Sequence, residues 1–420
     1  MRHKDPIKSL LLAAFHRAVQ ATSAKATLPV HLPTRAPRGR TLVLGAGKAA
    51  AAMGAVAAKT IDAPLHGMVV TRYGHECEIL ENEITIACAA HPVPDEQSTI
   101  IAREMLVLAQ GCKPEDRLLF LASGGGSSVL CLPAPGISLL QKQDIIRHLL
   151  HSGADIAQIN CVRKHLSAIK GGRLAAACGT RDIHTFIISD VPGDDPAAIA
   201  SGPTIADPTS LADARTVMAR YGTPHENVVM AALNNEAYET PKPGTLSERH
   251  MIIAKADNAL TAAAKWAQTK GWQVHNLGDR VEGEARHVGA NHAKIARDLK
   301  ARGGRWLLIS GGETTVTLRH KSGGGGPNLE YLAGLALALN GEAGITALSC
   351  DTDGIDGSED NAGAFVSPTT LSRAKVLGLD LKSYLEKNRT YSFFKALDDL
   401  IITGPTLTNV NDFRIIAIES

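Results

Sequence analysis

The stretch RLLFLASGGGSS, residues 117–128, places a continuous apolar run directly before three glycines and two serines. An apolar run without alternation is typical of a parallel strand that is buried on both faces. Small residues after such a strand let backbone N–H groups approach a phosphate or a carboxylate. The alternative is a tight turn that needs positive φ. The stretch therefore predicts a parallel sheet whose loop either binds an anion or turns sharply.

The same order of apolar strand and helix recurs along the chain, and it predicts an α/β fold with doubly wound parallel sheets. Helices are expected at 98–110, 138–152, 256–270, 282–301 and 328–340. A strand with a hairpin partner is expected at 314–318. The other strands are expected at 41–45, 67–71, 84–88, 117–122, 185–190, 251–254, 272–277, 305–310 and 345–350.

The segment 222–250 is polar and rich in proline, which is typical of a linker. It predicts one domain over 1–235 and a second over 245–420. The first 24 residues contain an apolar patch that His16 and Arg17 interrupt, so we expect an amphipathic helix rather than a signal peptide.

Composition excludes several classes of protein. The formal net charge is +2 and aromatic residues make up 4% of the chain, so a nucleic acid or a membrane is a poor partner. Seven cysteines are dispersed without a CxxC pair, which favours free thiols in the cytoplasm over a disulfide framework or a zinc site.

Polar and glycine-rich segments follow five of the expected strands. Since ligands of open parallel sheets bind beyond the carboxyl ends of the strands, these segments predict a binding cleft. The five segments are GAGKAA (45–50), SGGGSS (123–128), SDVPGDDP (189–196), SGGETT (310–315) and CDTDGIDGSED (350–360).

The segment GAGKAA also matches the dinucleotide fingerprint GxGxxA, but Thr71 and Arg72 stand where a ribose-binding acid is expected. Lys48 lies inside this loop, and a cation before a helix is unfavourable unless it faces an anion. We therefore expect Lys48 to bind a phosphate or a carboxylate, with a solvated lysine as the alternative.

Acidic residues after buried strands often hold Mg²⁺ and polarise a hydroxyl nucleophile. Asp190 and Asp353 are the candidates here, with helix capping and Asx turns as the alternative. A basic segment, residues 160–177, contains Arg163, Lys164, Lys170 and Arg173 and either binds an anion or forms a solvated helix face. His91, in HPVPDE (91–96), is a candidate acid–base residue or a structural one.

Seven motifs in order resemble the class II glycerate kinases, the MOFRL-domain family that is often named hydroxypyruvate reductase. These motifs are GAGKAA, HPVPDE, LASGGGSS, NCVRKHLSAIKGGRLA, SDVPGDDPAAIASGPT, SGGETTVT and DTDGIDG, and the resemblance extends to TNVNDFRI at 408–415. It implies a Rossmann-like N-terminal domain, a smaller MOFRL domain at about 303–415 and an active site in the interdomain cleft.

The resemblance further implies phosphorylation of D-glycerate by ATP and Mg²⁺, with 2-phospho-D-glycerate as the usual product. The expected partners are glycerate and ATP, with no nucleic acid or membrane, and a homodimer is allowed. The family motif GGRNQE corresponds to 325–330, where Pro327 replaces the arginine. If that arginine stabilises transferred charge, either Arg163 or Arg173 takes its role or the nucleotide is bound differently. The family's terminal asparagine region matches Asn409 and Asn411.

The candidate residues fall into four groups, with two acids in more than one. The catalytic candidates are Lys48, Asp190 and Asp353, and the metal candidates are Asp190, Asp351 and Asp353. The substrate or phosphate candidates are Ser123, Gly124, Gly125, Gly126, Ser127, Arg163, Lys170 and Arg173. The nucleotide candidates are Gly311, Gly312, Glu313, Asn328 and Asn409.

Two other functions stay open. GxGxxA and Arg72 would suit an NAD(P)H-dependent hydroxypyruvate reductase, but the ribose-binding acid is missing. A non-catalytic binder of phosphorylated metabolites would have to accommodate the acidic clusters, which repel an anion unless a metal is present.

Overall fold

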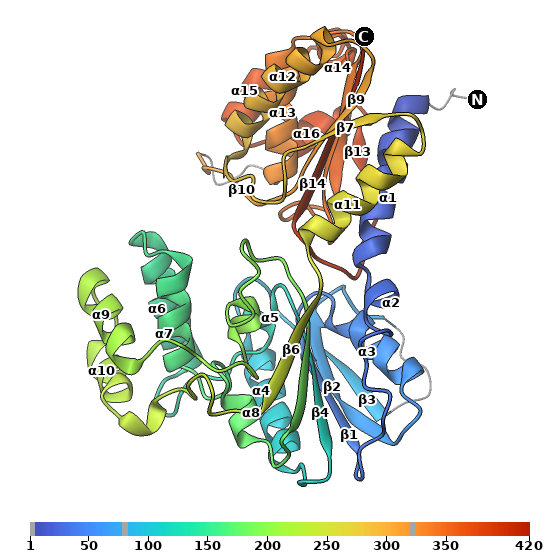
Figure 1. Ribbon diagram of the computed structural model, residues 1–420. Coiled ribbons are helices and arrows are strands. Elements are labelled where there is room, and N and C mark those ends of the chain that lie inside the picture. Colours follow the sequence, from blue (N-terminus) through green and yellow to red (C-terminus); the bar gives the residue numbers. More distant parts are fainter. Residues whose placement is uncertain (1–4, 78–82, 320–323) are drawn as a thin grey trace. The chain divides into compact units, whose positions relative to one another are not determined.

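A computed structural model describes residues 5–77, 83–319 and 324–420 (Figure 1). The chain forms two compact units. Ala24–Ala254 form the first, which we call the parallel-sheet unit. The described residues up to Ser23 and the segment Lys255–Ser420 form the second, which we call the mixed-sheet unit. This division differs from the expected one at both ends, because the N-terminal helix joins the second unit and the strand before Lys255 joins the first.

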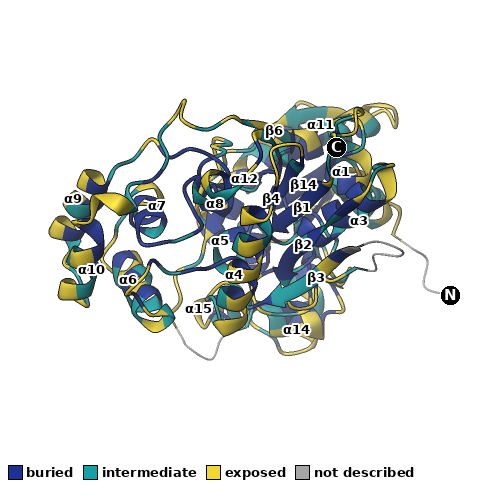
Figure 2. Cartoon of the chain, turned by 90° about the horizontal axis from the view of Figure 1, so that it is seen from below, coloured by how far each residue is buried: buried dark blue, intermediate teal, exposed yellow. Residues whose placement is uncertain are grey.

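The parallel-sheet unit is built on six parallel strands in the order β3-β2-β1-β4-β5-β6, the order of a Rossmann fold. The strand order reverses between β1 and β4. Every residue of β1 is buried, as expected for a strand covered on both faces (Figure 2). The strands are β1 (Thr41–Ala46), β2 (Leu65–Arg72), β3 (Glu83–Ala89), β4 (Arg117–Ser123), β5 (Asp182–Ile188) and β6 (Glu248–Ala254).

The predicted strands of this unit are all present, and the all-parallel sheet is confirmed. Four helices, α6, α7, α9 and α10, form a lobe beside the sheet with an apolar core of their own (Figure 1). Its helices are α6 (Leu139–His151), α7 (Ile156–His165), α9 (Leu211–Tyr221) and α10 (Glu226–Leu233). The other helices are α2 (Ala24–Thr27), α3 (Ala50–Thr60), α4 (Glu96–Gln110), α5 (Gly126–Val129), α8 (Arg173–Ala177), η1 (Ile199–Ser201) and η2 (Glu236–Tyr238).

The expectation of a parallel sheet is wrong for the mixed-sheet unit. Its main sheet has the order β13-β12-β11-β14-β9-β7, and only the β7–β9 pair is parallel. Parallel neighbours need a long crossover, whereas β11 reaches β12 through a short loop without a helix. The strands are β7 (Gln273–Asn276), β9 (Arg305–Ser310), β11 (Ile345–Asp351), β12 (Gly363–Val366), β13 (Leu400–Ile401) and β14 (Asp412–Glu419).

The expected hairpin at 314–318 is also wrong, because β10 (Thr314–Thr315) pairs in parallel with the distant β8 (Gly283–Glu284). The predicted helices 256–270, 282–301 and 328–340 are confirmed as α11, α12 and α13. The helices of this unit are α1 (Pro6–Thr22), α11 (Ala256–Gln268), α12 (Ala285–Ala301), α13 (Pro327–Leu339), α14 (Thr370–Val376), α15 (Leu381–Glu386) and α16 (Thr390–Ala396).

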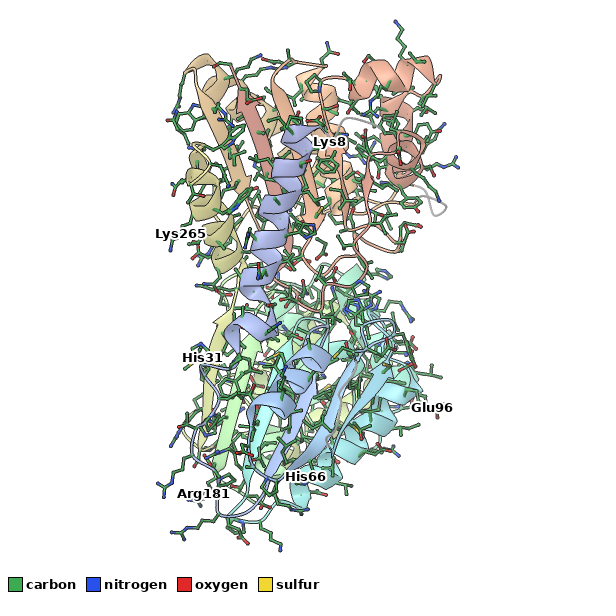
Figure 3. All side chains as sticks on the ribbon, turned by 90° about the vertical axis from the view of Figure 1, so that its right-hand side faces the viewer. Lys8, His31, His66, Glu96, Arg181 and Lys265 are labelled. Atoms are coloured by element: carbon green, nitrogen blue, oxygen red, sulfur yellow. The ribbon has the colours of Figure 1, made fainter. Side chains whose placement is uncertain are left out.

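Helix α1 confirms the amphipathic helix expected near the N-terminus. Asp5 caps it by accepting hydrogen bonds from the N–H groups of Ile7 and Lys8. Its buried face packs against α11 and β14 (Figure 3). Phe15 of this face contacts Phe413 with ring centroids 6.0 Å apart. The N-terminal segment is thus part of the core of the mixed-sheet unit. Within the described ranges, no helix combines the length and the apolar character needed to cross a bilayer.

Gly47 lies in the loop after β1, and replacing it tests how tightly this turn between strand and helix is packed. Its φ is +129°, and an added Cβ would lie 2.4 Å from the Ser123 carbonyl oxygen. We expect Gly47→Ala to lower the free energy of unfolding by about 3 kcal/mol, because both the backbone and the neighbouring loop must shift.

Gly74→Ala is the matched control, since Gly74 also has positive φ but nothing within 4 Å of an added Cβ. It should cost about 1 kcal/mol. Urea denaturation of the two variants measures both values, and equal losses would contradict a packing role for Gly47.

Candidate active site

The loops after β1 and β4 meet at the point where the strand order reverses. The Lys48 N–H donates to the Gly124 carbonyl at 2.8 Å, and the Ala49 N–H donates to the Ser123 hydroxyl at 3.0 Å. A Cβ added at Gly125 would lie 3.3 Å from Cγ of Lys48 and 3.0 Å from Cδ2 of His91. The side chains of Lys48 and His91 therefore lie at the glycine loop, where ligands of this fold class bind.

A pocket of about 660 Å³ opens beside this loop, and all of its lining residues belong to the parallel-sheet unit. One part of its wall consists of loops at the carboxyl edge of the sheet, including His91, Gly124, Gly125 and Asp190. Other lining residues belong to α6 and α7 of the helical lobe. Such a volume is typical of small-molecule and cofactor sites.

Three cationic side chains line the pocket without a carboxylate partner in the described part of the chain. Lys142 Nζ donates to the Leu166 carbonyl at 2.9 Å, and Lys170 Nζ donates to the Leu130 carbonyl at 2.6 Å. Arg163 Nη1 donates to Asn160 Oδ1 at 2.6 Å. Buried charges are costly unless they are paired, so this arrangement favours an anionic ligand.

Burial shifts the titration of these groups. It lowers the pKa of Lys142 to about 8 and that of Lys170 to about 7, together with a smaller effect of the nearby Arg163 charge. Burial also lowers the pKa of Arg163. Each shift reflects the cost of holding a positive charge away from water, a cost that a bound anion would offset.

The predicted phosphate-binding residues divide between the pocket wall and its support. Gly124, Gly125, Ser127, Arg163 and Lys170 line the pocket. Three others support the loops or lie elsewhere. The Ser123 hydroxyl holds Ala49, and a Cβ at Gly126 would lie 2.6 Å from Ala200 Cβ. The Arg173 guanidinium donates to the carbonyls of Tyr238 and Glu239 and does not line the pocket.

The predicted acids of the mixed-sheet unit follow β11 in an Asx-turn arrangement. The N–H of Asp353 donates to Asp351 Oδ1 at 2.9 Å, and the N–H of Ile355 donates to Asp353 Oδ1 at 2.8 Å. Asp353 is fully buried and Asp351 is half-buried. The alternative of turn chemistry thus accounts for one oxygen of each carboxylate. Among the described residues no group of three possible ligands is placed to hold a metal ion.

Asn328, a predicted nucleotide-binding residue, lies at the centre of a buried polar network. Its amide nitrogen donates to Asp356 Oδ1 at 3.3 Å and to Asp412 Oδ1 at 2.6 Å, and its amide oxygen accepts from the Ser349 hydroxyl. Arg414 donates to Asp412 and, at 2.8 Å, to the Gly311 carbonyl. All of the polar atoms of the Asn328 side chain are therefore used within the protein.

Asp356 fixes the start of α13. Its carboxylate accepts the N–H groups of Asn328 at 3.0 Å and Leu329 at 3.1 Å, and burial raises its pKa to about 7. Pro327 is the first residue of α13, a position that suits proline because the missing N–H has no partner there. The proline that replaces the family's arginine therefore has a local structural role.

Three further predicted nucleotide residues lie in the same unit. The carbonyl of Gly312 also accepts from Arg414, at 3.3 Å. Glu313 is exposed in the loop after β9, and Asn409 is buried with its Oδ1 accepting the N–H of Asn411 at 3.3 Å.

Sequence reasoning missed Lys142 and Asn160 as lining residues, whereas Lys164 belongs to the basic segment that was expected to bind an anion. Lys142 shares one face of α6 with the buried Ile145 and Leu149, at spacings of three and seven residues. A lysine in register with an apolar stripe was the signal that could have revealed it. Lys164 differs from the other cations because it pairs with Asp207 at 3.3 Å.

Replacing Lys170 tests whether burying its positive charge without a carboxylate partner costs folding free energy. Its pKa in the folded protein is about 7, against 10.5 for an unburied lysine. Between these two values the unfolded chain binds more protons, so Lys170 makes the free energy of unfolding rise with pH in this window. We expect Lys170→Met to stabilise the ligand-free protein at pH 6 by roughly 2 kcal/mol more than at pH 9.

Urea denaturation at the two pH values measures this difference, and Lys265→Met, an exposed cation of α11, is the control (Figure 3). A Lys170→Met effect that is independent of pH would contradict a depressed pKa in the native state.

Comparisons with known proteins agree with this architecture. A family model described as a domain of unknown function (DUF4147) matches residues 10–234, and the MOFRL family model matches residues 306–412. The chain is 47% identical over 98% of its length to an Agrobacterium vitis protein named "putative hydroxypyruvate reductase", of which it covers 94%. It is 36% identical to the D-glycerate 2-kinase of Thermotoga maritima, with 98% of each chain covered.

The crystal structure of the Thermotoga maritima glycerate kinase is similar to this one, with a TM-score of 0.85 over 98% of this chain and 99% of that one. The family resemblance seen in the motifs is thereby confirmed. With these matches over nearly its whole length, the chain belongs to the glycerate kinase family that combines DUF4147 and MOFRL domains.

Proposed function

We propose that this protein transfers the terminal phosphoryl group of ATP to D-glycerate in the presence of Mg²⁺ and releases 2-phospho-D-glycerate. The observation that carries the proposal is the pocket at the carboxyl edge of β4 and β5, where glycine-loop backbone, three uncompensated cations and Asp190 line one space. Phosphoryl transfer depends mainly on positioning and on neutralising charge, and these groups are suited to both tasks. Relatives named as glycerate 2-kinases support the choice of substrate.

Each residue of the loops has a distinct task in this proposal. Lys48 lies at the glycine loop and would neutralise charge on the transferred phosphoryl group. Gly125 would let phosphate or carboxylate oxygens approach the backbone, since a Cβ there would lie against His91 and Lys48. Gly124 lines the same pocket. Asp190 would orient the glycerate hydroxyl and accept its proton as attack proceeds.

Mg²⁺ would supply positive charge that offsets the negative charge of the phosphates. It usually takes one or two protein carboxylates and completes its shell with phosphates and water, so the chemistry of Asp351 and Asp353 fits it. Asp190, which lines the pocket of the parallel-sheet unit, is the alternative proposed ligand. The seven free cysteines support a cytoplasmic enzyme.

The second candidate is a nicotinamide-dependent hydroxypyruvate reductase. Its support is the Rossmann strand order with GAGKAA after β1, together with the name of the Agrobacterium vitis relative. Against it, β2 ends in Thr71 and Arg72, and Lys48 stands inside the glycine loop. The kinase is therefore the preferred function.

One set of assays separates the two candidates. We expect ADP to form from D-glycerate and Mg·ATP, and no oxidation of NADH or NADPH with hydroxypyruvate. ³¹P and ¹³C NMR of the product distinguishes 2-phosphoglycerate from 3-phosphoglycerate. Nicotinamide oxidation without ADP formation would establish the reductase. If neither reaction takes place, the result favours a non-catalytic binder.

Lys48→Ala tests the proposed catalytic lysine. Because the lysine acts on charge in the transition state, we expect kcat to fall by about two to four orders of magnitude, with the unfolding transition unchanged. Steady-state kinetics and thermal denaturation measure both effects. Lys265→Ala serves as the control on α11, and near-normal turnover of Lys48→Ala would refute the role.

A further inference from the structure

The segment 198–202 contains three consecutive residues in the left-handed conformation. Ala200 and Ser201 have φ values of +53° and +57°, and Gly202 follows with a φ of +56°. Residues other than glycine adopt this conformation at a cost, and such strained residues are found mostly at functional sites. Ala200 lines the pocket, whereas the Ser201 side chain is fully buried and does not line it.

Neighbouring backbone fixes this turn on one side. The Gly171 N–H donates to the Ser201 carbonyl at 3.0 Å, and the Gly172 N–H donates to the Gly202 carbonyl at 2.7 Å. On the other side Gly126 packs so closely that an added Cβ would lie 2.6 Å from Ala200 Cβ. None of these contacts uses the Ser201 hydroxyl, so the hydroxyl is available for another task.

The Ser201 hydroxyl joins two parts of the pocket wall. Its Oγ lies 2.7 Å from Ser127 Oγ in the loop after β4, and it donates to Asn160 Oδ1 of α7 at 3.5 Å. Asn160 Oδ1 also accepts from Arg163 Nη1 at 2.6 Å. Ser127, Asn160 and Arg163 all line the pocket, so Ser201 contacts its wall from within the protein.

The single proton of each hydroxyl restricts how this chain of hydrogen bonds is oriented. Asn160 Oδ1 can only accept, so while Ser201 donates to Asn160, the bond between the two serines uses the Ser127 proton. If Ser201 donates to Ser127 instead, the Ser127 proton is released for an anionic oxygen in the pocket. Asn160 Oδ1 then keeps the hydrogen bond from Arg163. The change requires only the rotation of two hydroxyl groups.

We propose that Ser201 is a positioning residue of the phosphoryl-transfer site, whose hydroxyl turns Ser127 into a hydrogen-bond donor for an anionic oxygen of the substrates. The strained backbone places this hydroxyl between the glycine loop and α7. The inference rests on the proposed function for the identity of the substrates. The coupling between the two serines is a property of the chain itself, and any phosphate anion that reaches Ser127 can report on it.

Ser201→Ala in the full chain removes the hydroxyl and keeps the backbone contacts. We expect the affinity for tripolyphosphate and the kcat/KM of the kinase reaction to fall by roughly tenfold each, because a hydrogen bond to a charged group is lost. Calorimetric titration measures the first value, and ADP formation from D-glycerate and Mg·ATP measures the second.

Ser201→Gly separates the hydroxyl from the strain. Glycine adopts a φ of +57° freely, so this variant should have a higher Tm than Ser201→Ala. We nevertheless expect the same tenfold losses, since both variants lack the hydroxyl. A merely structural role for Ser201 predicts instead that activity and affinity recover together with the Tm.

A double-mutant cycle tests whether Ser201 acts through Ser127. Ser127→Ala alone should show a similar loss, and the double variant with Ser201→Ala should lie within about twofold of Ser127→Ala. Ser98→Ala is the matched control, because Ser98 is a fully buried serine of the same unit whose hydroxyl donates to the Asp95 carbonyl. Neither Ser98 nor Asp95 lines the pocket, so both measurements should stay unchanged.

Three outcomes would overturn the inference: unaltered affinity and kcat/KM in Ser201→Ala, recovery of both in Ser201→Gly, or additive losses in the double variant. The two measurements keep this failure apart from failure of the proposed function. Absence of ADP formation in the unaltered protein, with the expected losses of tripolyphosphate affinity in the variants, refutes the kinase only. An unaltered protein that neither binds tripolyphosphate nor forms ADP refutes both.

Discussion

Lys48 donates its backbone N–H to Gly124, and Ala49 donates to the Ser123 hydroxyl, where the strand order of the parallel sheet reverses. This close approach is available only because Gly47 lacks a side chain that would strike Ser123. It brings the loops after β1 and β4 together and keeps Lys48 beside Gly125. The other features of the pocket, from Asp190 to the cations of the helical lobe, depend on a sheet edge whose loops are fixed in this way.

The helical lobe and the loop after α7 supply cationic side chains to the pocket. The helices of the lobe bury Lys142 and hold Arg163 against Asn160, while the loop after α7 buries Lys170. No carboxylate balances these three charges within the described ranges, so the folded chain bears a cost of desolvation that an anion would reduce. Because Lys170 then titrates near neutral pH, anion binding and protonation are linked: a bound anion raises the pKa of the lysine, and a protonated lysine strengthens binding of the anion.

The strands and helices of the parallel sheet could be predicted because continuous apolar runs report burial on both faces. The direction of the strands in the second sheet could not be predicted, because an apolar run such as ITALSC does not show whether the neighbouring strand is parallel or antiparallel. The strands β12 and β13 span four and two residues, too few to show a pattern. Lys142 was missed for a different reason: a lysine by itself indicates an exposed position, and only its register with Ile145 and Leu149 marks it as buried.

The motif DTDGIDG shows why residue roles are harder to predict than motifs. Asp356 is buried and caps α13, whereas Asp351 and Asp353 form successive Asx turns after β11. Asn328 then joins Asp356 to Asp412, and Arg414 ties Asp412 to the loop after β9. A loop that presents a carboxylate to a ligand also contains buried backbone N–H groups that need acceptors. Carboxylates and amides can accept several of these hydrogen bonds at once, so acidic and amide residues also serve to support such a loop. The same short sequence therefore contains both supporting and candidate ligand-binding acids, and only the contacts of each side chain separate them.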